Sequence, residues 1–536
     1  MKRAVKFDRV ILNARIVDGT CDPWFYGDVG VRRGKVDFVG SLRDFETGET
    51  IDAGGKVLTP GFIDMHTHYD LSLLRDPVMI SKLIQGVTTI GIGQCGLSPA
   101  PISDVNKSLL DQYMSFIKAG VEPDWGWNTF DEWLEKLEEL HLGLNVFSFV
   151  GHGTIRLNVL GFQDRSPNKE ELAHMKGLVA RSMEQGAFGM TSGLIYPPGV
   201  YADPEEIREV CEGLREFRGL YLTHMRNEGV HVLRSVMETL MIGKANSIPV
   251  HILHLKVMGS QNRGVMKDLL HLLHNAREEG MDVTADVYPY TATSTTLRAM
   301  LPAWIQEGGL QELFKRLEDS YGRRRVLDEM RRDWQQENSI RNCDGPGGVL
   351  ILHAPATPEV EGKNLEEAGK ILGLRPLEAV LEIVSRNEGK DTAAYFNIME
   401  DDMLRALGSP QVMIASDSLP VVEGGRCHPR SNGTFPRIFG RYVREKKVIS
   451  LEQAVWKITG FPASRLGLSG KGLIREGMDA DMVLFDPEKI IDRADFDFPS
   501  ALPEGIERVF IAGETVVKNG EFSGPRLGKV LRKRQY

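Results

Sequence analysis

The sequence lacks long apolar runs, paired cysteines and any excess of positive charge. No apolar stretch approaches the about 20 residues that a membrane-spanning helix needs. The basic start MKRAVKF leads into a segment that Asn13 and Arg15 interrupt, so it contains no signal-peptide core. These absences argue against a membrane protein and favour a soluble one.

The few cysteines and the net negative charge argue against further classes of protein. The five cysteines, at positions 21, 95, 211, 343 and 427, are scattered and form neither a CxxC pair nor a disulfide framework. The net charge of −9 argues against a nucleic-acid partner, because binding phosphates requires a basic surface. We therefore expect a protein of the reducing cytoplasm that acts on a small molecule. Nothing in the sequence indicates its oligomeric state.

The two ends of the chain resemble each other and differ from the middle. With 536 residues, the chain is longer than one core usually fills. Both ends contain short β-branched runs separated by Gly and Asp turns, such as VILNARIVDG and IERVFIAGETVVKNGEF. We predict a small β-sandwich domain built from residues 1–59 and 470–536, around a larger domain at 60–469.

The middle of the chain alternates short apolar runs with helical patterns, which is typical of βα units around a parallel sheet. One helical pattern starts at Thr129, which with Glu132 predicts a capping box. Eight such strands predict an α/β fold, a (β/α)8 TIM-type barrel. The predicted strands are 61–68, 87–95, 144–152, 187–192, 219–224, 249–254, 282–288 and 411–417.

A long segment, 298–347, separates the seventh and eighth predicted strands. It has helical spacing, and 18 of its 50 residues are charged. We predict an exposed helical insertion after strand seven. Because active sites of this fold lie at the carboxyl ends of the strands, such an insertion is well placed to act as a lid.

Residues that can bind metal occur at the ends of several predicted strands. His66 and His68 are two residues apart and therefore point to the same face of their strand. Because all strand ends of a barrel meet at one mouth, we expect these donors to converge. Imidazole, thiolate and carboxylate together suit zinc, and the number of donors leaves one or two metal ions open. The complete set is His66, His68, Cys95, His224, His254 and Asp417.

Over nearly its whole length the sequence resembles the amidohydrolase superfamily, and within it the N-acyl-D-amino-acid deacylases. The resemblance rests on an ordered set of motifs. These are GFIDMHTHYD, GQCGLSPAP, GMTSGLIYPPGVYA, YLTHMRNEG, HILHLKVMG, DVYPYTATST, SDSLP, HPRSNGTFPRIFGRYVRE and GLIREGMDADMVLFDP. The resemblance implies a zinc-dependent barrel that hydrolyses the amide bond of N-acyl-D-amino acids and releases a carboxylate and a free D-amino acid.

The resemblance also implies roles for individual residues. Cys95 would replace the bridging carboxylated lysine of other amidohydrolases. The tight zinc site would use Cys95, His224 and His254, and a weaker second site would use His66, His68 and Asp417. Zinc-bound water is the expected nucleophile, with Asp417 as general base and acid. The expected substrate contacts are Tyr196, Lys256, Tyr288, Ser294 and Arg430.

Two other functions remain open at this point. A relative acting on cyclic amides, such as hydantoin or dihydropyrimidine rings, would share the barrel and most of the donors, although such enzymes typically carry the bridging lysine. A non-catalytic scaffold would be expected to have lost ligands, whereas all six are present here.

Overall fold

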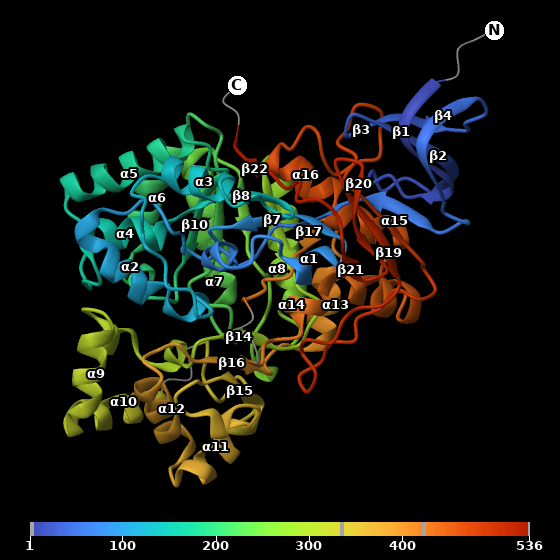
Figure 1. Ribbon diagram of the computed structural model, residues 1–536. Helices are drawn as coiled ribbons and strands as arrows, with labels where there is room; N and C mark the ends of the chain where they lie inside the picture. Colours follow the sequence, from blue (N-terminus) through green and yellow to red (C-terminus); the bar gives the residue numbers. More distant parts are fainter. Residues whose placement is uncertain (1–4, 333–336, 421–424, 534–536) are drawn as a thin grey trace.

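Short parallel strands form the centre of the molecule, as the sequence predicted (Figure 1). The computed structural model describes residues 5–332, 337–420 and 425–533. Each predicted strand is present, and the third is interrupted at Phe149. The strands are β6 (Phe62–Asp64), β7 (Val87–Ile92), β8 (Asn145–Ser148) with β9 (Val150–Gly151), β10 (Gly189–Gly193), β11 (Leu220–His224), β12 (Val250–Ile252), β13 (Val283–Val287) and β17 (Val412–Ile414).

All neighbouring pairs among these strands are parallel. β6 pairs with β7 and β7 with β8, while β9 to β13 pair in chain order and β13 pairs with β17. An isolated parallel bridge between Thr67 and Ser418 links the ends of the first and last strands. The carboxyl ends of the strands therefore lie at one edge, as a (β/α)8 arrangement requires.

Helices separate the strands and cover their outer side. In α3 the predicted capping box is present: the Thr129 side chain accepts from the Glu132 N–H, and the Glu132 carboxylate accepts from the backbone of Thr129. The helices of this layer are α1 (Ile80–Leu83), α2 (Lys107–Tyr113), α3 (Phe130–Glu138), α4 (His152–Leu160), α5 (Lys169–Glu184), α6 (Pro204–Val210), α7 (Val232–Asn246), α8 (Met266–Glu278), α13 (Glu400–Gly408), α14 (Arg430–Arg437), α15 (Leu451–Ile458) and α16 (Gly460–Leu466). Within the described ranges, no helix is both long and apolar enough to cross a membrane.

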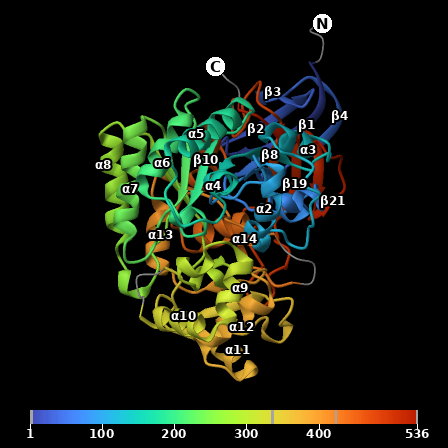
Figure 2. The same ribbon diagram turned by 90° about the vertical axis from the view of Figure 1, so that its left-hand side faces the viewer.

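Strands from both ends of the chain share one sheet. β18 pairs antiparallel with β5 and thereby joins the two groups, which lie side by side in Figures 1 and 2. The strands of this sheet are β1 (Val5–Ile16), β2 (Phe25–Arg32), β3 (Lys35–Gly40), β4 (Phe45–Asp52), β5 (Val57–Pro60), β18 (Met482–Phe485), β19 (Ile506–Ile511), β20 (Glu514–Lys518) and β21 (Glu521–Phe522).

The segment after β21 leaves this sheet and joins the barrel. β22 (Val530–Leu531) pairs in parallel with β8, and the Lys533 N–H donates to the carbonyl of Gly186, just before β10. The segment thus lies along β8, while β10 pairs with β9. Periodicity could not predict this, because two residues carry no recognisable pattern.

The insertion after the seventh strand is larger than residues 298–347. Helices α9 (Leu310–Glu318) and α10 (Ser320–Arg332) pack with α11 (Leu365–Leu372) and α12 (Pro376–Arg386), and the four lie together below the barrel in Figure 2. A three-stranded antiparallel sheet completes this inserted unit, and it has an apolar core of its own. Its strands are β14 (Thr293–Thr295), β15 (Val349–His353) and β16 (Thr392–Tyr395).

The shared core of the inserted unit predicts how the chain tolerates deletion. Removing 298–347 alone should give aggregated protein, because it exposes buried apolar side chains such as Ile351, Val380 and Ile383. Replacing 296–392 by Asn-Gly should give a soluble protein that unfolds cooperatively, since Thr295 and Ala393 are already paired and a two-residue turn can connect them. Soluble yield and thermal unfolding by circular dichroism measure both. Cooperative unfolding of the shorter deletion, with aggregation of the longer one, would contradict this.

Candidate active site

The six predicted metal ligands meet at the carboxyl edge of the barrel strands. All are buried, with at most 7% of any residue exposed. Their donor atoms form overlapping groups in which every pair lies within 4.8 Å: His66, His68 and Cys95; Cys95, His224 and His254; and His66, His254 and Asp417. The convergence expected from the strand ends is therefore present in the structure.

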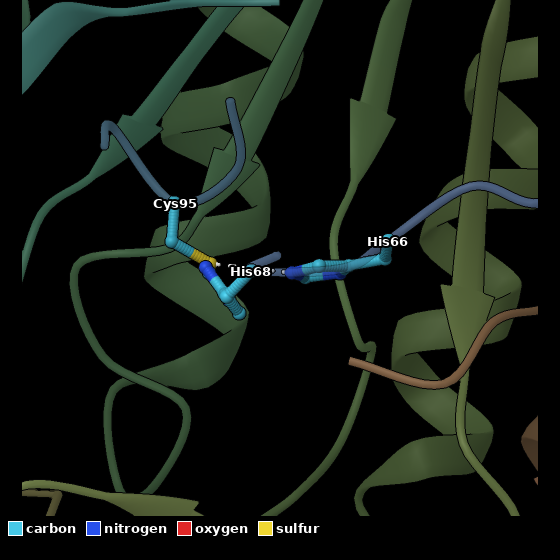
Figure 3. A group of neighbouring side chains, drawn as sticks. All are labelled: His66, His68 and Cys95. Carbon is cyan, nitrogen blue, oxygen red and sulfur yellow. Dashed lines mark hydrogen bonds between the residues drawn. The ribbon is translucent and has the colours of Figure 1, made fainter. Parts of the chain in front are cut away.

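Cys95 belongs to two of these three groups. Its Sγ is 3.4 Å from Nε2 of His66 and 3.6 Å from Nε2 of His254. Figure 3 shows Cys95 and His66 pointing toward each other from opposite sides. One sulfur thus faces imidazoles from two different strands, which is the arrangement that a ligand shared between two metal positions would need.

Asp417 faces the histidines on the other side of the mouth. Its Oδ1 lies 3.3 Å from Nε2 of His66 and 3.3 Å from Nε2 of His68. Its Oδ2 forms an ion pair of 2.9 Å with Nη1 of Arg430, which is itself buried. Arg430, predicted as a substrate contact, therefore also fixes the carboxylate predicted to be catalytic.

Three of the six donors have an unusual backbone. Cys95, His254 and Asp417 have φ values of 50°, 37° and 49°, in the left-handed region that side chains other than glycine rarely adopt. Such a conformation costs on the order of 1–3 kcal/mol and persists only where the surroundings enforce it. It turns each side chain toward the common centre directly after its strand ends.

Asp286 is a buried carboxylate that we did not predict, and it contacts three histidines at the mouth. Oδ1 of Asp286 accepts the backbone N–H of His254 at 2.7 Å, and Oδ2 lies 2.9 Å from His251 Nε2 and 3.7 Å from His66 Nδ1. Carboxylates in this position orient metal-binding imidazoles. Asp286 lies on β13 two residues before Tyr288, which the sequence placed at the site, so strand periodicity directs both side chains to the same face and could have identified Asp286.

A second buried network joins the first and last strands. Nζ of Lys82 donates to Asp64 at 3.0 Å and to Ser416 at 2.9 Å, and all three residues have no solvent exposure. Asp64 also accepts the N–H of Ser416 at 2.9 Å. Because Asp64 and Ser416 immediately flank the donor segments of β6 and β17, this network fixes the separation of those segments.

Lys256 is held by an acidic residue that sequence reasoning missed. Its Nζ donates to Oε2 of Glu228 at 2.6 Å and lies 2.7 Å from Nδ1 of His254. Oε1 of Glu228 also lies 2.9 Å from Nδ1 of His254, and Oε2 lies 3.5 Å from Nε2 of His224. Glu228 is four residues after His224 in the motif THMRNEG, and this spacing was the available signal.

The other predicted substrate contacts surround the same space. The Arg430 guanidinium lies 4.7 Å above the ring centre of Tyr288, and Nη2 donates to the carbonyl of Ser294 at 3.4 Å. The Tyr288 hydroxyl and the Ser294 hydroxyl are buried and have no hydrogen-bond partner in the described part of the chain. Tyr196 packs edge-on against His224 and shares a 2.9 Å hydrogen bond with Thr295.

A cavity opens onto these groups. It is bordered by the donors of five strands, by the loop carrying Phe116, and by the inserted unit. The lining residues include His68, Cys95, Tyr196, His224, Glu228, His254, Lys256, Tyr288, Ser294, Glu337 and Asp417. Of the predicted substrate contacts, Arg430 lies behind this wall and reaches the cavity through Asp417 and Tyr288.

The electrostatics of the donors fit a bound metal cation. Burial raises the pKa of the Cys95 thiol well above its usual value, and it lowers the pKa of His224 to about 4. Burial alone would raise the pKa of Asp417, but Arg430 and His66 outweigh it and hold that pKa well below normal. The His224 imidazole is therefore neutral and the Asp417 side chain ionised, so both are ready to bind a metal ion, and a cation would stabilise the Cys95 thiolate. Nitrogen, sulfur and oxygen donors in this combination suit zinc.

Comparison with known proteins agrees with this geometry. Residues 49–517 match the model of the amidohydrolase family. The chain is 35% identical to D-aminoacylase of Alcaligenes xylosoxydans xylosoxydans over 529 residues, which covers 98% of this chain and 97% of that protein.

Two solved structures extend the comparison. A structure of D-aminoacylase, from work on the functional role of its binuclear metal center, superposes with a TM-score of 0.82 at 35% identity, covering 98% of this chain and 100% of that one. N-acyl-D-glutamate deacylase of Bordetella bronchiseptica, complexed with zinc and a phosphonate mimic of the tetrahedral intermediate, has a TM-score of 0.82 at 31% identity with the same coverage. From its barrel, its converging donors and these full-length similarities, the chain belongs to the amidohydrolase superfamily and, within it, to the N-acyl-D-amino-acid deacylase family.

Proposed function

We propose that this protein hydrolyses the amide bond of N-acyl-D-amino acids with the help of zinc, releasing a carboxylate and a free D-amino acid. The observation that carries the proposal is one buried group of imidazole, thiolate and carboxylate donors that opens onto a cavity bordered by Lys256. The handedness of the substrate comes from the relatives, which act on N-acyl-D-amino acids by name.

The donors divide into two sets. Cys95, His224 and His254 would hold the tight metal, because their donor atoms form one group on the cavity side. His66, His68 and Asp417 would complete a weaker second position, since Asp417 lies equally close to both imidazoles. A bound zinc ion would polarise the amide carbonyl and make water a stronger acid.

Asp417 is suited to move the proton. Its low pKa keeps it ionised, so it can accept a proton from the attacking water and then transfer it to the departing nitrogen. Arg430 holds the other carboxylate oxygen and thereby keeps Oδ1 directed toward the mouth. Positioning of this kind is the main contribution that fixed residues make to an acid–base step.

Lys256 and the hydroxyl groups beside it would bind the amino-acid carboxylate. Lys256 borders the cavity, and the hydroxyls of Tyr288 and Ser294, which have no partner among the described residues, can donate to an anion beside it. Arg430 adds positive charge from behind Tyr288. With the amide and the carboxylate both fixed, the two enantiomers differ in where the side chain points, so one of them loses a contact or clashes. Tyr196, next to His224, is placed to donate to the developing oxyanion.

A substrate panel tests the function directly. The metal-loaded protein is offered N-acetyl amino acids as D and L pairs, together with hydantoin and dihydrouracil, and acetate release or ring opening is measured. We expect hydrolysis of the D forms, and at least ~100-fold lower kcat/KM for the L forms, because a lost charged contact costs a few kcal/mol. Ring opening would favour a cyclic-amide hydrolase, and no turnover of any substrate would favour a scaffold.

Replacing the central sulfur tests the metal site. Cys95→Ala should lose the tight zinc and nearly all activity, since a thiolate is removed from a set of three ligands. The variant should still fold, because the barrel core does not depend on one sulfur atom. Cys211→Ala is the matched control: that cysteine is equally buried but belongs to no donor group in the described part of the chain. The zinc content and the turnover of each purified protein are measured. A Cys95→Ala variant that kept both would refute the role of Cys95 as a zinc ligand.

Neutralising the carboxylate tests the proton path. Asp417→Asn should lower kcat by more than ~100-fold, the lower scale of acid–base contributions, while the Cys95–His224–His254 metal is retained. The thermal midpoint should also fall, because buried Arg430 loses its only carboxylate partner among the residues that the structure describes. Asp268→Asn, on the exposed surface, controls for the charge change alone. An unchanged kcat would mean that another group carries the proton.

A further inference from the structure

One carboxylate at the mouth comes from the inserted unit and has no part in the mechanism above. Glu337 is 3% exposed and borders the cavity. Its Oε1 lies 3.3 Å from Nε2 of His224, and its Oε2 accepts the backbone N–H of Glu228 at 2.8 Å. The side chain therefore ends directly beside one of the proposed metal ligands.

No lysine or arginine of the described residues pairs directly with Glu337. Besides His224, its side-chain contacts in the described ranges are the Glu228 N–H and the Asn338 amide. The nearby ammonium of Lys256 is already bonded to Glu228. A buried carboxylate without a cation is costly, so this position favours one that is supplied from elsewhere.

Barrel loops hold the backbone of Glu337 in place. The Asn342 side chain donates to the carbonyl of Glu337 at 2.7 Å, and Gln261 in turn donates to Asn342. Ser260 donates to Asp344 at 2.6 Å in the same turn. The inserted unit is thus attached to the loop after β12, and the carboxylate is presented to the mouth in a defined position.

The donor atoms of His224, Glu228 and Glu337 lie within 4.8 Å of one another, and this group shares His224 with the Cys95–His224–His254 group. The Glu228 oxygen that faces His224, Oε2, is bonded to Lys256, whereas Oε1 of Glu337 faces His224 without a lysine or arginine partner among the described residues. We infer that Glu337 is a further ligand, supplied by the inserted unit, of the metal ion held by Cys95, His224 and His254. The inference rests on the proposed metal site.

This ligand would change the character of the centre. Catalytic zinc sites usually have three protein ligands and one open position, whereas four protein ligands are typical of closed, structural sites. With Glu337 as a ligand, the inserted unit would complete the coordination, and the open position would exist only after this carboxylate withdraws. The inserted unit would thereby control both how tightly the metal is held and when the centre is accessible.

The test compares Glu337→Ala and Glu337→Gln with the wild-type chain. Each protein is loaded with Zn²⁺ or Co²⁺, the metal affinity is measured by competition with a chelator, and the visible absorption of the Co²⁺ form reports the ligand set. We expect the dissociation constant to rise about tenfold or more in both variants, since even groups that only support a ligand contribute on this scale. The Co²⁺ spectrum should change in both. Glu361→Gln, in the same unit but paired with His353 away from the donor groups, should behave as wild type.

The conservative variant keeps the experiment decisive. The amide oxygen introduced by Glu337→Gln would still accept the Glu228 N–H, so this variant should fold even if Glu337→Ala does not. A wild-type metal affinity and Co²⁺ spectrum in Glu337→Gln would overturn the inference while leaving the proposed function intact. If the wild-type chain itself bound neither metal, the proposed centre would fail, and the inference with it.

Discussion

Burying an ionisable group is expensive unless a partner of opposite charge or a hydrogen bond compensates it, and this cost governs the mouth of the barrel. Side chains with lone pairs point there from five strands and are almost completely shielded from water. Fixed ion pairs account for part of them: Asp64 with Lys82, Glu228 with Lys256, and Asp417 with Arg430. The remaining nitrogen and sulfur atoms face one another, and a metal cation is the partner that satisfies them together.

The strained backbone at three donors is a further free-energy cost at the mouth of the barrel. Left-handed φ values at Cys95, His254 and Asp417 cost free energy that packing alone would not select. The hydrogen bonds around them enforce the geometry: Asp286 accepts the N–H of His254, and the N–H of Asp417 donates to the carbonyl of His66. The strained backbone lowers the stability of the fold, but it holds the donors in place before metal and substrate bind.

Sequence patterns were sufficient for the strands and their terminal donors, because both follow from local spacing. A donor such as His224 or Cys95 stands where a short apolar run ends, and the barrel rule then brings the ends together. The supporting groups were harder to find. Lys82 and Ser416, for example, are far apart in the chain, and nothing local marks either as a partner of Asp64. Glu337 was hidden in a charge-rich helical segment where one more acidic residue carries no signal.

The place of β22 has a consequence for how the molecule is made. Domains generally fold from the N-terminus as the chain is synthesised. Val530 nevertheless pairs with Val146, and Leu531 with Phe147, so the sheet around β8 lacks a neighbour until nearly all of the described chain has left the ribosome. The sheet that joins β5 to β18 has the same requirement. Contacts so distant in sequence form late, and the growing chain must remain soluble with an unfinished barrel until β22 is available to pair.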